Sequence, residues 1–147
     1  MKLQALIPAA ALAIAPYAGA DPVEHRSNHE IVQAMFKAFN AHDVDALKAV
    51  YAEDAVVYSP ESCTPTRGRD AIGEGYAEMF AYIPDVHDRL DRIVAEGDYA
   101  AVMFTASSQA QGAEFELPIS AFLTFEDGLV VEDRAYYDTD VVLDCEG

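Results

Sequence analysis

Residues 40–60 predict a short helix that leads directly into a buried strand. Asp43 is placed to cap this helix, because its carboxylate can accept a hydrogen bond from a backbone amide of the first turn. The inner face of the helix is formed by Leu47, Val50 and Tyr51. The helical spacing ends before residues 55–59, an apolar run that predicts a strand and that Pro60 terminates. A helix and a strand joined this closely indicate a domain in which helices and a sheet share one core.

Two longer helices are predicted, one on each side of this unit. The first begins at Ser27, which together with Glu30 has the residues of a capping box, and ends near Asn40. The other runs over residues 69–83, and Pro84 stops it. Their inward faces are Ile31, Ala34, Met35, Ala38 and Phe39 in the first and Ile72, Tyr76, Met79, Phe80 and Ile83 in the other.

The remainder of the chain is predicted to be strands separated by short polar turns. The predicted strands are 86–96, 99–107, 115–125 and 129–138. Because helices come first and strands follow, the chain is expected to be α+β, with a parallel α/β fold excluded by the lack of alternation. We expect a cone-shaped α+β barrel in which three N-terminal helices pack on a curved antiparallel sheet. Such a cone leaves a pocket lined by strand residues of one parity and by the facing helices.

The N-terminus has the features of a secretory signal peptide. Residues 1–20 carry one lysine, an apolar stretch, and Ala18-Gly19-Ala20, which fits a signal-peptidase site. Pro8 and Pro16 interrupt the stretch, and it is too short to span a bilayer. We therefore expect residues 1–20 to be removed and residues 21–147 to form one exported domain, periplasmic or secreted.

The charge of the chain limits its partners. The formal net charge is −17, and removal of Lys2 with the signal peptide leaves the mature chain one unit more negative. Such a field repels phosphate backbones and anionic membrane surfaces. We expect no nucleic-acid partner and no membrane association after signal cleavage.

Cys63 and Cys145 are the two cysteines of the chain. An even number of cysteines in an exported protein favours a disulfide. A reactive thiol is the alternative, but no His or Lys lies within three residues of either cysteine to lower its pKa. We expect a disulfide between Cys63 and Cys145.

Three stretches together resemble the nuclear transport factor 2-like superfamily, which includes ketosteroid isomerases and SnoaL-like polyketide cyclases. These are residues 40–60, the run Arg67-Gly68-Arg69-Asp70-Ala71-Ile72, and Ala135-Tyr136-Tyr137-Asp138. The resemblance covers about residues 28–140 and implies the cone fold. It implies little about substrate, because one fold hosts many functions.

The resemblance argues against ketosteroid isomerase activity. The positions of the three isomerase catalytic groups, a carboxylate base, a tyrosine and a protonated aspartate, fall here on Ser59, Met35 and Ala121. Supporting aromatic positions are matched by Tyr51, Tyr76 and Tyr137. Tyrosines also pack well in an ordinary core, so these matches by themselves indicate no reaction.

In the SnoaL-like cyclases an aspartate near the end of the last strand serves as general base, and Asp138 is the residue here that could match it. Strand alternation places Tyr137 and Asp138 on opposite faces unless a bulge intervenes. Without a bulge, Asp133 shares the face of Tyr137 and is the better pocket carboxylate. Both aspartates could instead be ordinary members of an acidic surface. Arg134 is a possible partner that would hold such a carboxylate ionised.

His87 is expected where a strand enters the cone, where it could donate to a bound carbonyl or phenolate or simply be solvated. No histidine pair has metal-ligand spacing with a carboxylate on one face, so we expect no metal and no cofactor. The residues expected to bind a ligand are Ser59, Tyr76, His87, Met35 and Ala121.

The sequence thus predicts an exported domain that binds a small apolar or aromatic molecule. It is expected to catalyse a proton-transfer step, either isomerisation, cyclisation or dehydration, with Asp138, Asp133 and Tyr137 as candidate catalytic residues. The alternative is a non-enzymatic binding or dimerisation module. A homodimer is expected through the outer sheet face, to which Phe104, Phe122 and Tyr136 are assigned.

Overall fold

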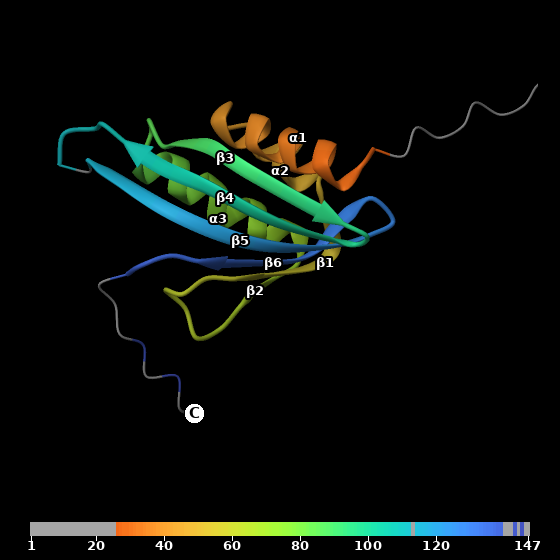
Figure 1. Ribbon diagram of the computed structural model, residues 1–147. Coiled ribbons are helices and arrows are strands. Elements are labelled where there is room, and N and C mark those ends of the chain that lie inside the picture. Colours follow the sequence, from red (N-terminus) through yellow and green to blue (C-terminus); the bar gives the residue numbers. More distant parts are fainter. Residues whose placement is uncertain (1–25, 113, 140–142, 144, 146–147) are drawn as a thin grey trace, which may run out of the picture.

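The computed structural model describes residues 26–112, 114–139, 143 and 145. The predicted signal peptide, residues 1–20, lies outside the described residues. Within them the chain is α+β, with three helices packed on a six-stranded sheet (Figure 1). No helix in this described part is long and apolar enough to cross a bilayer.

The two N-terminal helices begin at the caps predicted from the sequence. Helix α1 (Asn28–Asn40) has a capping box in which the Glu30 amide donates to Ser27 Oγ at 3.3 Å and the Ser27 amide donates to Glu30 Oε2 at 2.7 Å. Helix α2 (Val44–Lys48) is capped by Asp43, whose Oδ1 accepts from the Ala46 amide at 2.9 Å. Helix α3 (Arg69–Tyr82) follows Gly68, which has φ +89° and no side chain to strain at that angle.

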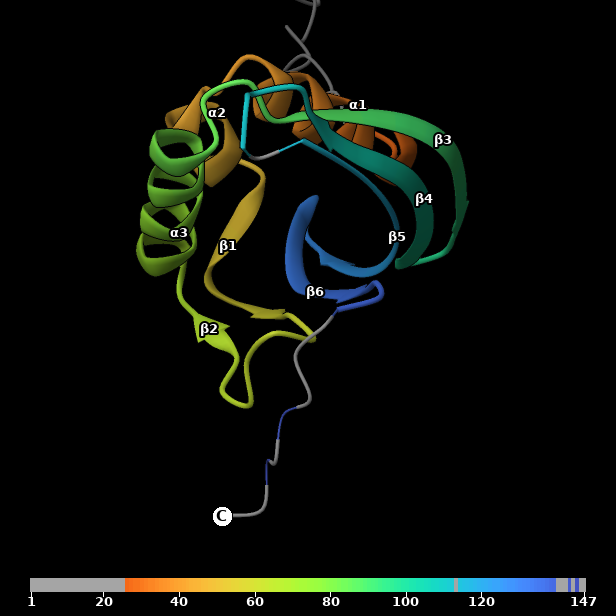
Figure 2. The same ribbon diagram turned by 90° about the vertical axis from the view of Figure 1, so that its left-hand side faces the viewer.

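The sheet has the strand order β2-β1-β6-β5-β4-β3. Its strands are β1 (Tyr51–Tyr58), β2 (Thr66–Arg67), β3 (His87–Glu96), β4 (Tyr99–Ser108), β5 (Phe115–Glu126) and β6 (Leu129–Tyr136). Every pairing is antiparallel except that of β1 with β6, which is parallel. Figure 2 shows the sheet curling strongly, with α1 and α3 on its concave side. This arrangement confirms the expected α+β class.

Three boundaries differ from the sequence prediction. Strand β1 begins at Tyr51, directly after α2, because Tyr51 turns its fully buried side chain inward as a strand residue. Strand β2 is short and was not expected, since two exposed residues carry no periodic signal. Strand β6 ends at Tyr136, two residues before Asp138.

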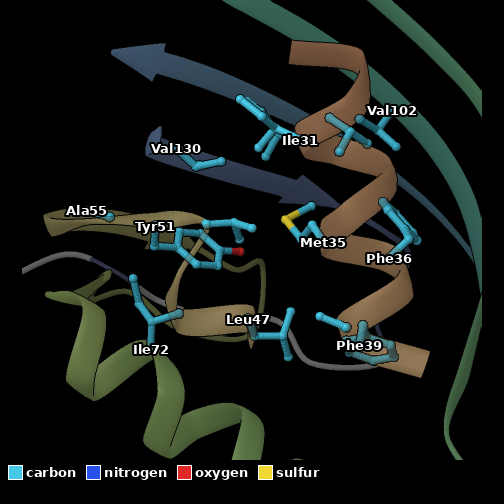
Figure 3. Packing of buried hydrophobic residues seen from close by; sticks show 14 of the residues in the cluster. Ile31, Met35, Phe36, Phe39, Leu47, Tyr51, Ala55, Ile72, Val102 and Val130 are labelled. Atoms are coloured by element: carbon cyan, nitrogen blue, oxygen red, sulfur yellow. The ribbon is translucent and has the colours of Figure 1, made fainter. Parts of the chain in front are cut away.

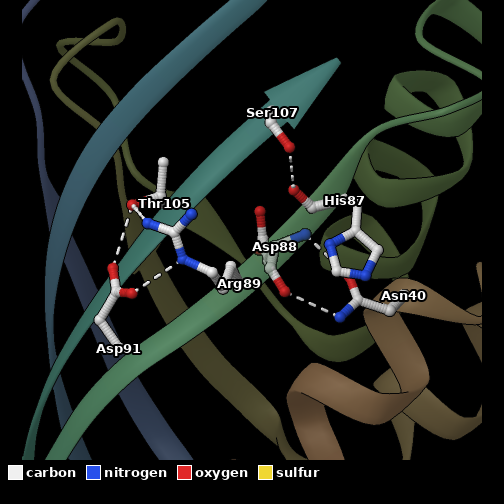
Figure 4. A network of polar contacts seen from close by, with 7 residues as sticks. All are labelled: Asn40, His87, Asp88, Arg89, Asp91, Thr105 and Ser107. Atoms are coloured by element: carbon white, nitrogen blue, oxygen red, sulfur yellow. Dashed lines mark hydrogen bonds and ion pairs between the residues drawn. The ribbon is translucent and has the colours of Figure 1, made fainter. Parts of the chain in front are cut away.

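Bulges bend two of the strands. In β3, Leu90 pairs with Phe104 and Arg92 with Met103, so Asp91 is an extra residue. Asp91 lies on the side away from α1, where its carboxylate accepts bonds from Arg89 and Thr105 (Figure 4). In β6, Val130 pairs with Phe125 and Glu132 with Thr124, so Val131 is also an extra residue. An extra residue increases local twist and changes which side chains face inward.

The core lies between α1 and the concave face of the sheet (Figure 3). Ile31, Met35 and Phe36 of α1 belong to this core together with Val102 of β4 and Val130 of β6. The ring of Phe36 meets that of Phe104 edge to face at 4.9 Å between centroids. Phe104 therefore faces inward, and its assignment to the outer sheet face is wrong, whereas Phe122 and Tyr136 are about half exposed on that outer face.

The predicted disulfide is present. Cys63, in the loop between β1 and β2, is bonded to Cys145 in the C-terminal segment, across 82 positions of sequence. It ties the end of the chain to the loop beside the first strand. Closing so long a loop restricts the unfolded chain by about 4–5 kcal/mol in the chain-entropy description.

Candidate active site

A cavity of about 840 Å³ lies between the concave face of the sheet and helices α1 and α3. Its volume is in the range of pockets that hold small organic ligands. Most of its wall is apolar and includes Met35, Phe39, Ile72, Met79, Ile119 and Ala121. Polar groups are few, so each one has a strong effect on what the cavity can bind.

Asp133 of β6 lies at the wall of this cavity with its side chain buried. The Tyr51 hydroxyl donates to Asp133 Oδ2 at 2.9 Å. The hydroxyls of Tyr51 and Tyr76 are also 2.9 Å apart. Since the Tyr51 proton is used on Asp133, Tyr76 donates to Tyr51, and the three groups form a chain of hydrogen bonds that ends on the carboxylate.

Burial changes the proton affinity of all three groups. It raises the pKa of Asp133 to about 6, while the hydrogen bond from Tyr51 acts in the opposite direction. Burial and the Asp133 charge also raise the pKa of Tyr51 and of Tyr76 above their ordinary values. At neutral pH the site therefore holds two neutral tyrosines and a carboxylate that is mostly ionised.

The bulge at Val131 determines which carboxylate faces the cavity. Val130 pairs with Phe125, and Asp133 pairs with Leu123, so both face inward although they are three residues apart. Ala135 and Tyr137 continue the inward face and line the cavity. Asp138 is exposed beyond the end of β6 and does not line the cavity.

Arg134 does not pair with Asp133. It lies opposite the outward-facing Phe122, and its guanidinium is 3.7 Å from the centre of the Tyr58 ring and 3.4 Å from Glu132. Among the described contacts, the Asp133 carboxylate is therefore stabilised by one hydrogen bond, that from Tyr51.

Ser59 and Tyr137 form a second polar pair, with 3.0 Å between their hydroxyl oxygens. Both line the cavity, next to the exposed Glu61. Burial raises the pKa of Tyr137 despite the opposing hydrogen bond to Ser59, so its hydroxyl stays protonated at neutral pH.

The strand entrance holds an aspartate rather than the expected histidine. His87 is exposed and does not line the cavity, whereas Val86 and Asp88 do. The main chain of Asp88 is fixed by Asn40, whose amide donates to the Asp88 carbonyl and accepts from the Asp88 amide, both at 2.8 Å (Figure 4). Burial raises the pKa of Asp88 to about 7.

A sequence signal for Asp88 exists. Val86, Asp88 and Leu90 alternate along the start of β3, so Asp88 shares the face of two apolar residues while His87 takes the other face. An acidic residue on an apolar strand face is unusual in an ordinary core, where charged groups are rarely buried without a partner.

The remaining sequence candidates lie around the same cavity. Met35, Ser59, Tyr76 and Ala121 all line it. No group of three or more His, Cys, Asp or Glu side chains able to hold a metal occurs among the described residues. The carboxyl groups of Asp88 and Asp133 at the cavity wall can take up, hold and return protons near neutral pH.

The chain belongs to the SnoaL-like domain family, whose model matches residues 32–133. Its fold is shared with solved proteins described as candidate polyketide cyclases and as a candidate ketosteroid isomerase.

Solved structures show the same fold. A loop-truncation variant of IdmH is 26% identical, with 75% of this chain and 91% of that chain covered and a TM-score of 0.67. Wild-type IdmH is a candidate polyketide cyclase from Streptomyces antibioticus. A candidate polyketide cyclase from Sinorhizobium meliloti is 25% identical, with 73% and 94% covered and a TM-score of 0.60. A candidate ketosteroid isomerase from Kribbella flavida is 22% identical, with 78% and 79% covered and a TM-score of 0.66.

Proposed function

We propose that this protein is an acid–base enzyme that moves a proton on a small, largely apolar or aromatic ligand held in the cavity. The observation that carries the proposal is the buried Asp133 carboxylate, which lies at the wall of an apolar cavity and is held by the Tyr51 hydroxyl. Isomerisation, cyclisation and dehydration of a carbonyl compound all begin with such a step.

In the proposed step Asp133 is the base. A C–H bond beside a carbonyl of the ligand breaks, its proton forms an O–H bond on the Asp133 carboxyl, and the electron pair passes to the carbonyl oxygen as an enolate. The Ser59 and Tyr137 hydroxyls supply hydrogen-bond donors within the same cavity. The proton then returns to the ligand at another atom, or is lost with a leaving group.

The pKa of Asp133 suits this role. A carboxylate with an ordinary pKa is a weak base, whereas a pKa of about 6 leaves Asp133 mostly ionised at pH 7 and a stronger acceptor. Tyr51 and Tyr76 are positioning residues, because their hydrogen bonds fix the carboxylate without contact to the reacting atom.

The proposal is tested by hydrogen–deuterium exchange into an aromatic ketone such as 2-tetralone, followed by NMR in D2O. We expect the protein to accelerate exchange and Asp133→Asn to lower the rate by about 10²- to 10⁴-fold. The rate should rise with pH through the pKa of Asp133, since only the ionised form accepts a proton.

Asp138→Asn is the matched comparison, because it makes the same change at the exposed aspartate of the same segment. We expect it to retain the exchange rate. Exchange that survives in Asp133→Asn would overturn the assignment of the base, and loss of exchange in Asp138→Asn alone would move it to that residue.

We also propose that the protein is exported. The disulfide between Cys63 and Cys145 is compatible with an oxidising compartment. An exported product that begins at Met1, measured by intact mass, would contradict cleavage after residue 20.

A further inference from the structure

Asp88 is an acceptor without a partner inside the cavity. The residue is 7% exposed, and its Oδ1 has no hydrogen-bond partner among the described residues. Asn40 bonds to the main chain of Asp88 and leaves the carboxyl group free. Leaving a buried carboxyl oxygen unpaired is costly, and Asp88 is also one of the residues that line the cavity, so the carboxyl group is a candidate for ligand recognition.

The charge of the cavity wall limits what that group can be. Among the described lining residues, Glu61, Asp88 and Asp133 are acidic and no Lys, Arg or His occurs. Arg134, which follows Asp133 in β6, is stacked on Tyr58 and paired with Glu132. A ligand with its own carboxylate or phosphate would meet like charges without a counter-ion.

Aromatic rings stand beside the carboxylates. Tyr76 lies close enough to both aspartates that each charge raises the pKa of its hydroxyl, after the larger effect of burial. Its ring packs edge to face on Phe39 at 6.0 Å and stacks near Phe80 at 6.2 Å between centroids. Ring faces next to a carboxylate are a favourable environment for an organic cation.

We propose that the ligand of this cavity is an apolar molecule that carries a protonated amine, with its ammonium group bound by the Asp88 carboxylate. The ammonium donates to the Asp88 carboxylate, and the apolar body lies along the wall that includes Met35, Ile72 and Met79. A charge-assisted bond of this kind is about twice as strong as one between neutral groups.

A protonated amine also explains why two of the acidic residues that line the cavity are buried. Asp133 is engaged by Tyr51, while Asp88 is not engaged by any described side chain. One carboxylate is thereby held for proton transfer and the other is left for recognition. This inference rests on the proposed function in taking the cavity as a ligand site, but its test measures binding alone.

The experiment compares three naphthalene probes that differ in one group: 1-(aminomethyl)naphthalene, 1-(hydroxymethyl)naphthalene and 1-naphthoate. Binding to the full protein at pH 8 is followed by isothermal titration and by naphthalene fluorescence, which no tryptophan of this chain obscures. We expect the amine to bind at least about 10-fold more tightly than the alcohol, and the carboxylate to bind least.

Asp88→Asn tests the residue. It keeps the size of the side chain and removes its charge, so it should weaken amine binding by about 10- to 100-fold and change alcohol binding little. Asp54→Asn, which neutralises an exposed aspartate of β1 outside the cavity, is the matched control for overall charge and should leave amine binding unchanged.

Amine binding should also strengthen as pH rises from 5.5 to 8, because the Asp88 carboxyl must lose its proton to pair with the ammonium. The alcohol should show no such dependence. The other titratable groups that line the cavity are Tyr58, Glu61, Tyr76, Tyr82, Asp133 and Tyr137. Asp133→Asn separates the two aspartates, since the pH dependence should persist in it and disappear in Asp88→Asn.

The possible results bear differently on the amine inference and on the proposed function. Equal binding of amine and alcohol would overturn the amine inference and keep the cavity as a ligand site. Loss of amine binding in Asp133→Asn but not in Asp88→Asn would overturn the assignment to Asp88. Failure of all three probes to bind would count against both the amine inference and the proposed function.

Discussion

At the scale of single residues, the cavity places two carboxyl groups where they cost stability. The Asp133 carboxylate accepts a hydrogen bond from the Tyr51 hydroxyl. The main chain of Asp88 is hydrogen-bonded to Asn40, but Oδ1 of its carboxyl group has no partner among the described residues. Proteins tolerate such groups mainly at functional sites, where strain and unpaired charge are part of the mechanism.

Asp88→Asn should therefore stabilise the protein at alkaline pH. Burial raises the pKa of Asp88 to about 7, above its ordinary value of 3.8, so between these values the native state binds more protons than the unfolded chain. The stability contributed by the neutral carboxyl is present below pH 4 and is lost as pH rises through 7. We expect Asp88→Asn to gain about 2–4 kcal/mol over the wild type at pH 8.5 and little at pH 4, measured by urea unfolding. A gain that did not depend on pH would contradict this origin.

The positions of some individual side chains could not be predicted from the sequence. Alternation placed Tyr137 and Asp133 on one face, and the structure has both at the cavity wall. It could not place Asp138, because that depends on where a bulge falls. Asp88 was missed because the neighbouring His87 was predicted to bind the ligand, although Asp88 lies on the apolar face of the strand.

At the scale of elements, local signals were sufficient wherever one face of the chain is apolar and caps are explicit. Both caps, at Ser27 and Asp43, followed from short-range chemistry, whereas α2 ends at Lys48 and does not include Val50 and Tyr51 as the helical spacing had predicted. The bulges at Asp91 and Val131, and the parallel pairing of β1 with β6, arise from contacts between segments far apart in sequence. No local pattern reports these contacts, so the sequence predicted a curved sheet but not the positions of the bulges or the parallel pair.

Asn40 joins the end of α1 to the start of β3, and this link should matter for both stability and binding. Asn40→Ala removes two hydrogen bonds of 2.8 Å and leaves the amide and carbonyl of Asp88 unpaired, so we expect a loss of about 2–3 kcal/mol in thermal or urea unfolding. Amine binding should weaken with it, because Asp88 is no longer fixed.

Asn28→Ala is the control at the other end of the same helix. The Asn28 side chain donates a single exposed hydrogen bond to the Gly97 carbonyl, and its removal should cost less than about 1 kcal/mol. Equal losses in the two variants would mean that Asn40 acts only through helix propensity and not through β3.

At the scale of the whole molecule, the outer face of the sheet carries large apolar side chains that are exposed in the described part of the chain. Met103, Phe122 and Tyr136 are each between 52% and 53% exposed, and the rings of Phe122 and Tyr136 pack against each other at 5.9 Å. They lie on the neighbouring strands β4, β5 and β6 and share the outer face with Ser120 and Arg134. Such a surface on an otherwise highly acidic chain favours association with a second copy.

We expect a homodimer through this face, with a mass by light scattering of twice that of one chain at micromolar concentration. Because a two-fold interface brings the same patch of both copies together, Phe122→Glu places two like charges near each other and should yield monomers. Tyr82→Glu makes the same kind of change at an aromatic residue that is 84% exposed on α3, away from the sheet face, and should leave the dimer intact. Added salt should strengthen association, because it screens the repulsion between two chains of net charge −17. A wild-type protein that stays monomeric at every salt concentration would show that this apolar surface does not join two copies of the chain.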